Sequence, residues 1–104
     1  MTDYSKIIDH VINCKVAQIT GESAPKFEEW GISRIVPDYC NDPVYAWPLI
    51  RKNVISLGYD GISWEAFSVK WGISYNDWKS HPEHPLRIAM ILFIMGMELE
   101  HGMR

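Results

Sequence analysis

Near its C-terminal end the chain carries an apolar run that limits how the protein can fold. Every residue from Ile88 to Met97 is apolar or glycine, and Pro85 stands just before the run. Proline suits the first position of a helix, where its missing N–H would have no helical partner. We therefore predict a helix over residues 85–100, in which Arg87 is the only charged residue before Glu98.

This predicted helix lacks the polar stripe that a surface helix shows. It must be covered on most sides, either by the rest of the chain or by a second copy, and we predict a homo-oligomer that associates through the helix starting at Pro85. The apolar run is shorter than the ~20 residues that a membrane-spanning helix needs. No membrane partner is expected.

Periodicity and end signals predict two further helices. Apolar residues at steps of three and four indicate a helix over residues 3–20, followed by Gly21 at a position that favours a left-handed residue. Asp42 can cap a second helix over residues 43–53 by accepting from free backbone N–H groups. Pro48 lies inside that helix and has no N–H for the carbonyl of Val44, so we expect either a kink or a later start.

The middle of the chain predicts a small antiparallel sheet. Asp60-Gly61 favours a two-residue turn between strands at 55–59 and 62–71. In the second strand the alternation predicts that Phe67, Val69 and Trp71 face the core. One further strand is expected over residues 30–36, and residues 72–84 are expected to be irregular. The fold class is therefore α+β, with the sheet packed against three helices in one domain over residues 1–104.

Charge and cysteine usage exclude several classes of partner. The net charge of −3 argues against binding of duplex nucleic acid, which needs a basic face to displace counterions. The first residues are not those of a secretory leader, so we expect Cys14 and Cys40 to be reduced thiols in the cytoplasm.

No complete catalytic or metal-binding set is visible in the sequence. The common phosphate-loop, dinucleotide and nucleophile-elbow motifs are missing. His81-Pro82-Glu83-His84 could hold a metal with Cys40 or His101, but the spacing fits a loop better. Cys40, near a helix start, is better explained as a half-buried turn residue than as a nucleophile. We predict no enzymatic activity, no metal and no cofactor.

The start of the closing helix is a candidate anion site. Free N–H groups, the helix dipole, His84 and Arg87 could together hold a phosphate. Alternatively, Arg87 lies on an exposed edge of the helix and pairs with a surface acid.

Two segments carry a family resemblance. Residues 37–50 and 84–93 resemble the NinX-like family of small bacteriophage proteins and the related phage α-β-α sandwich domain. The resemblance covers about residues 1–97 and implies a phage accessory protein without assigned catalytic residues. The matching positions are Tyr39, Cys40, Ala46, Trp47, Pro85, Leu86, Arg87 and Ala89.

These matching positions have two interpretations. Ala46 and Trp47 could pack the second helix on the sheet, or the residues at the start of that helix could line a pocket. On the second interpretation, five Trp and five Tyr supply stacking or interface surface. We predict a ligand site formed by Tyr39, Asn41, Asp42, Trp47, His84 and Arg87.

The function predicted from the sequence is non-enzymatic. We expect a phage protein that counters host defence by sequestering a small anionic, nucleotide-like host signal. The alternative is an inhibitor that binds a host enzyme or defence protein through an aromatic or apolar patch.

Overall fold

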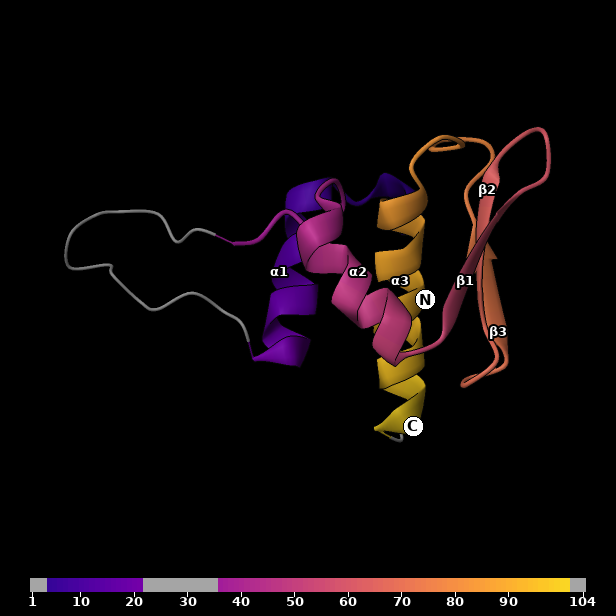
Figure 1. Cartoon of the computed structure of the whole chain (residues 1–104). Helices are drawn as coiled ribbons and strands as arrows, with labels where there is room; N and C mark the ends of the chain where they lie inside the picture. Colours follow the sequence, from indigo (N-terminus) through magenta and orange to yellow (C-terminus); the bar gives the residue numbers. More distant parts are fainter. Residues whose placement is uncertain (1–3, 22–35, 102–104) are drawn as a thin grey trace.

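The computed structural model describes residues 4–21 and 36–101, and over these residues the fold is α+β, as predicted (Figure 1). A three-stranded antiparallel sheet lies on one side of helix α3 (Pro85–Glu100), while α1 (Asp9–Thr20) and α2 (Pro43–Lys52) lie on the other. None of the helices in the described ranges is long and apolar enough to cross a membrane.

Helix α3 forms the centre of the core and has the predicted bounds. All residues from Arg87 to Ile94 are buried, because α1 and α2 cover one side and the strands cover the other (Figure 1). The apolar run is thus covered within one chain, and its composition does not by itself require a second copy. Self-association through α3 stays a prediction.

Helix α1 begins later than predicted. Residues Tyr4–Lys6 form a separate 3-10 turn (η1), and Ile8 is extended with φ −73° and ψ 158°. The break has a physical reason, because it turns the carbonyl oxygens of Tyr4 and Ile7 toward the side chain of Arg87. The end is as predicted, since Gly21 has φ 80° and donates its N–H to the carbonyl of Ala17.

Helix α2 begins at Pro43, so the later start considered for Pro48 is wrong. The Asp42 carboxylate accepts from the N–H of Val44 at 3.0 Å, which caps the helix as predicted. Pro48 lies within the helix, is exposed, and has no N–H to donate to the carbonyl of Val44.

The sheet has the order β1-β2-β3, formed by β1 (Ile55–Tyr59), β2 (Trp64–Ser68) and β3 (Ile73–Asn76). The third strand lies in the segment predicted as irregular, because four residues after Gly72 give too short an alternation to recognise. The strand predicted over residues 30–36 lies outside the described residues except for Val36, which is not in a strand.

The predicted hairpin is confirmed, but its turn is longer than two residues. Tyr59 pairs with Trp64, so Asp60, Gly61, Ile62 and Ser63 form a four-residue loop. The Asp60 side chain closes this loop by accepting from the N–H groups of Ile62 and Ser63 at 2.8 and 2.9 Å. Only Gly61 has the positive φ that the predicted turn would need at both central positions.

The buried face of β2 is the opposite of the predicted one. Phe67 and Val69 are exposed, whereas Ala66 and Ser68 are buried under α3. Their small side chains let the helix approach the sheet, and the Ser68 hydroxyl donates to the carbonyl of Asn53 at 2.9 Å. Trp71 follows the strand and packs against the core, with its ring beside Phe93.

Candidate functional site

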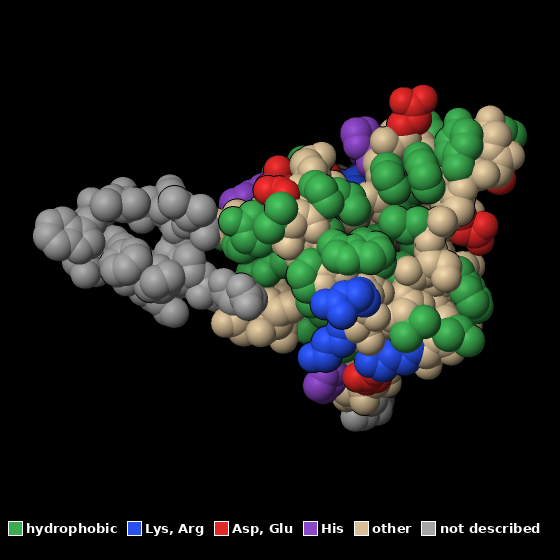
Figure 2. All heavy atoms as spheres, in the orientation of Figure 1, with side chains coloured by type: hydrophobic (Ala, Val, Ile, Leu, Met, Phe, Trp, Pro, Cys, Tyr) green, Lys and Arg blue, Asp and Glu red, His purple; other side chains and the backbone are tan. Residues whose placement is uncertain are grey.

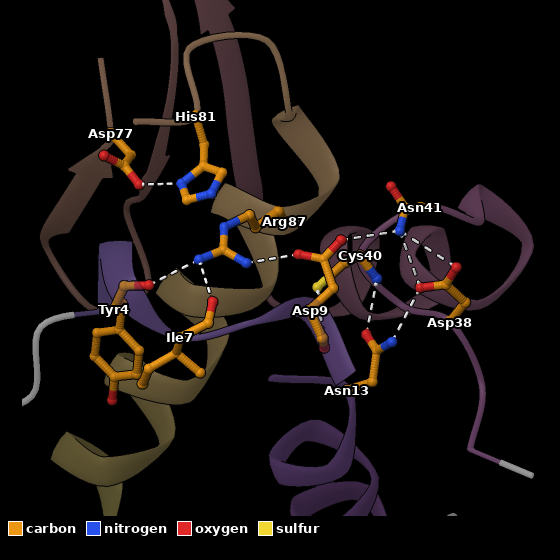
Figure 3. A network of polar contacts seen from close by, with 10 residues as sticks. All are labelled: Tyr4, Ile7, Asp9, Asn13, Asp38, Cys40, Asn41, Asp77, His81 and Arg87. Carbon is orange, nitrogen blue, oxygen red and sulfur yellow. Dashed lines mark hydrogen bonds and ion pairs between the residues drawn. The ribbon is translucent and has the colours of Figure 1, made fainter. Parts of the chain in front are cut away.

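A polar network joins the starts of the three α-helices (Figure 3). All three helices run in the same direction, so their N-terminal ends lie at one end of the molecule (Figure 1). Asp9 is the first residue of α1, Asn41 directly precedes the cap of α2, and Arg87 lies in the first turn of α3. A carboxylate is favoured there because helix N-termini carry partial positive charge.

Arg87 is the buried centre of this network, with 1% of its surface exposed. One terminal nitrogen, Nη1, donates to Asp9 Oδ1 at 2.6 Å. The other, Nη2, donates to the carbonyl oxygens of Tyr4 and Ile7 at 2.8 and 2.6 Å. Arg87 therefore neither lies on an exposed edge nor presents its terminal nitrogens to a ligand.

The second oxygen of Asp9 reaches the segment before α2. Asn41 donates its amide to Asp9 Oδ2 at 3.1 Å and also to the Asp38 carboxylate. Asn13 donates to Asp38 at 3.0 Å and accepts from the backbone N–H of Cys40 at 3.0 Å. The Asp9 carboxylate thus lies between Asn41 and Arg87, where the sequence predicted the anionic group of a ligand.

The network lowers the pKa of Asp9. Partial burial raises the pKa of this carboxyl, but the hydrogen bonds from Arg87 and Asn41 and the positive charge of Arg87 outweigh it. The ionised carboxylate is consequently the form that stabilises the fold.

We expect this contribution to disappear in acid. A lowered folded-state pKa means that stability is present above the unfolded value, near ~4, and is lost as the pH falls through the folded value. Urea unfolding followed by circular dichroism should show wild type more stable than Asp9→Asn at pH 6, with the difference shrinking toward pH 3. Other carboxyls titrate in both proteins and cancel. A difference that stays constant from pH 6 to pH 3 would contradict this role for Asp9.

Cys40 is not arranged as a nucleophile. Its side chain is buried, and its Sγ lies 3.8 Å from the backbone carbonyl oxygen of Asp9. Burial, with a smaller effect from the Asp9 charge, raises the pKa of the Cys40 thiol to about 12. The thiol therefore stays protonated at neutral pH, whereas thiol nucleophiles react as thiolates.

The predicted metal-ligand candidates do not gather into a site. Among residues 4–21 and 36–101, no group of three His, Cys, Asp or Glu side chains is placed to hold a metal ion. His81 Nδ1 instead hydrogen-bonds Asp77 Oδ2 at 2.7 Å, and the ring of His84 lies 5.9 Å from that of His81.

The six predicted ligand residues are only partly brought together. Asn41 and Arg87 meet through Asp9, while Tyr39 is buried and makes an edge contact with Tyr45. Asp42 is engaged as the cap of α2. Trp47 and His84 are exposed and make no hydrogen bond with the network in the described part of the chain.

Sequence reasoning missed Asp9 as the partner of Arg87. Asp9 is not among the apolar residues that predict the first helix, and nothing near it in the sequence links it to Arg87. The available signal was Arg87 itself, because an arginine within an apolar helix needs an acid or carbonyls from elsewhere in the fold.

Comparison with known protein families finds a match that covers most of the chain. The model of the family described as Bacteriophage P22, NinX matches residues 3–97, which include the whole network. The chain belongs to this family. No curated protein and no solved structure shows a significant match. Membership in the NinX family indicates a bacteriophage accessory protein.

The segment 37–50, which resembles the family, includes an exposed apolar surface on α2. Val44, Tyr45, Trp47 and Pro48, here named the α2 face, are all exposed, with Val44 at 72% and Trp47 at 56%. Ala46 and Ile50 point into the core from the same helix. Figure 2 shows hydrophobic side chains over α2, bordered by Lys and Arg side chains near the C-terminal end of the helix.

Proposed function

We propose that this phage protein acts by binding rather than by catalysis, and that it binds a host enzyme or defence protein through the α2 face. The observation that carries the proposal is the exposure of Val44, Tyr45 and Trp47 together on one short helix. Aromatic side chains that lie in the open on a rigid element are frequent anchors of protein interfaces. Their burial by a partner would release water from a surface that residues 4–21 and 36–101 leave exposed.

Charge next to the α2 face adds specificity to this proposal. Arg51 and Lys52 end the helix, and neither forms an ion pair within the described residues. Such cations at the rim of an apolar patch favour a partner with carboxylates around an apolar centre. The biological role that follows is inhibition of a host protein as a counter-defence measure.

Capture from host lysate tests the α2 face, and two exposed tryptophans give a matched comparison. Trp47 on α2 and Trp78 beyond β3 are 56% and 55% exposed. We expect wild type and Trp78→Ser to retain one bacterial protein in stoichiometric amount. Trp47→Ser should retain at least ~10-fold less, the loss typical of a removed aromatic anchor. Equal capture by Trp47→Ser, with both variants folded by circular dichroism, would reject the α2 face as the binding surface.

A second candidate is the sequestering of a small nucleotide-like host signal. It is favoured by a groove of about 520 Å³ beside the start of α3, whose lining includes Lys6, His10, His84 and Arg87. These side chains suit a phosphate group, but the buried ring of Tyr39 offers no open face for stacking on a base. Thermal stabilisation by a member of a panel of cyclic and linear nucleotides tests this candidate.

A further inference from the structure

We propose that the groove beside the start of α3 binds a phosphate-sized oxyanion. The groove lies between residues 5–10 and the segment 81–87, and we name it the His81–His84 groove. This site is independent of the α2 face. As the phosphate subsite of a nucleotide, it would rest on the nucleotide candidate proposed above. As a site for inorganic phosphate, it does not depend on that candidate.

The first observation is an unpaired donor on a buried cation. Arg87 Nε is buried and has no hydrogen-bond partner within the described chain, and 1% of the residue's surface is exposed. Figure 3 shows Nη1 and Nη2 turned to Asp9, Tyr4 and Ile7, while the Nε edge of the guanidinium faces His81. Buried N–H groups are almost always paired in folded proteins. Because this N–H is out of reach of water, an acceptor would complete the guanidinium with a small shift of the His81 side chain that faces it.

The second observation is the uncapped start of α3. His84 precedes the helix and makes no side-chain hydrogen bond to its first turn, and Pro85 has no N–H. The N–H groups of Leu86 and Arg87 therefore remain as donors at the positive end of a 16-residue helix. Backbone N–H groups at a helix start commonly bind oxyanions, and Arg87, which carries the unpaired Nε, lies in this same first turn.

The charges around the groove agree with an anionic occupant. Lys6 forms no ion pair within the described residues, and His10 and His84 add imidazole donors. Among the described residues that line the groove, Asp9 is the acidic one, and its carboxylate is already engaged with Arg87. Asp77, which bonds His81 from behind the groove lining, and the exposed Glu83 do not line it. A tetrahedral oxyanion matches a set of donors that come from several directions, as either inorganic phosphate or the phosphate of a nucleotide.

The test uses inorganic phosphate as the probe and the full chain as the protein. We expect saturable binding in isothermal titration calorimetry, with the amide resonances of Leu86 and Arg87 shifting during the titration. Lys6→Ala/His84→Ala should bind at least 10-fold more weakly, because both exposed side chains line the groove. The control Lys79→Ala/His101→Ala removes one lysine and one histidine that do not line it and should bind as wild type does. Arg87 is left unchanged because the fold depends on it.

The outcomes separate the site from the nucleotide candidate. Two results together support both the anion site and the nucleotide candidate. Phosphate binding is lost in Lys6→Ala/His84→Ala, and a nucleotide binds wild type at least 10-fold more tightly than phosphate does. The same loss with no preference for a nucleotide supports the anion site and removes the nucleotide candidate. No saturable phosphate binding, or equal binding by the groove variant and wild type, would overturn the site.

Discussion

Replacing Arg87 with Met is expected to lower the free energy of unfolding by about 4 kcal/mol, a large part of the 5–15 kcal/mol typical of a domain. The variant loses three hydrogen bonds from a charged donor, each worth roughly 1.5–3 kcal/mol. It also leaves the carbonyls of Tyr4 and Ile7 without their donor. Asp9, which is partly exposed, recovers some of this energy by contacting water.

Urea unfolding followed by circular dichroism measures this loss, and Lys79→Met serves as the control. Lys79 is an exposed cation outside the network, so its replacement should change stability by less than about 0.5 kcal/mol. Arg87→Lys keeps the positive charge but loses the several N–H donors of the planar guanidinium. Its free energy of unfolding should therefore lie between those of wild type and Arg87→Met. A loss below about 1 kcal/mol in Arg87→Met would show that the network does not hold the helices together.

Gly96→Ala is expected to destabilise the protein by about 2 kcal/mol, although alanine favours a helix over glycine by about 1 kcal/mol. Gly96 is buried in α3, and a Cβ there would overlap the ring of Trp71. The ring would have to move away from Phe93 and from Glu100, to which its Nε1 donates at 2.8 Å. Overpacking of this kind typically costs 1–3 kcal/mol.

A double-mutant cycle gives the sharpest test of this packing. In a Trp71→Ala background the space beside position 96 is open, so Gly96→Ala should become stabilising by about 0.5–1 kcal/mol. The sign of the effect therefore reverses between the two backgrounds. The same destabilisation with and without the Trp71 ring would show that the ring is not what excludes a side chain at position 96.

Features marked by strong local signals were predictable from the sequence. The bounds of α3 followed from Pro85 and the apolar run, and the cap at Asp42 and the end at Gly21 followed from their chemistry. The buried face of β2 was not predictable from alternation, because the sheet places the larger Phe67 outward and the smaller Ala66 under α3. Hydrophobicity alone does not report how closely a helix approaches a strand.

Two residues of the polar network were predictable from the sequence, but the residue that joins them was not. Arg87 and Asn41 stood out in short segments that resemble a known family, but the residue between them, Asp9, lies far away in the chain. The sequence predicted a bound anionic ligand beside Arg87, whereas the terminal nitrogen Nη1 of Arg87 contacts the carboxylate of Asp9, a side chain of the protein itself. Local patterns do not identify such long-range partners.

The contacts of Arg87 also join two segments that are synthesised far apart in time. The ion pair with Asp9 spans 78 positions of the chain, and the bond to the Tyr4 carbonyl spans 83. Closing such a long loop costs chain entropy, and the contact between the two segments offsets that cost only once it has formed. During synthesis, the start of α1 must therefore wait for α3 to leave the ribosome before it receives its counter-ion. The first helix is made early and can contact residues 38–41 at once, but its start gains this ion pair after α3 has been made.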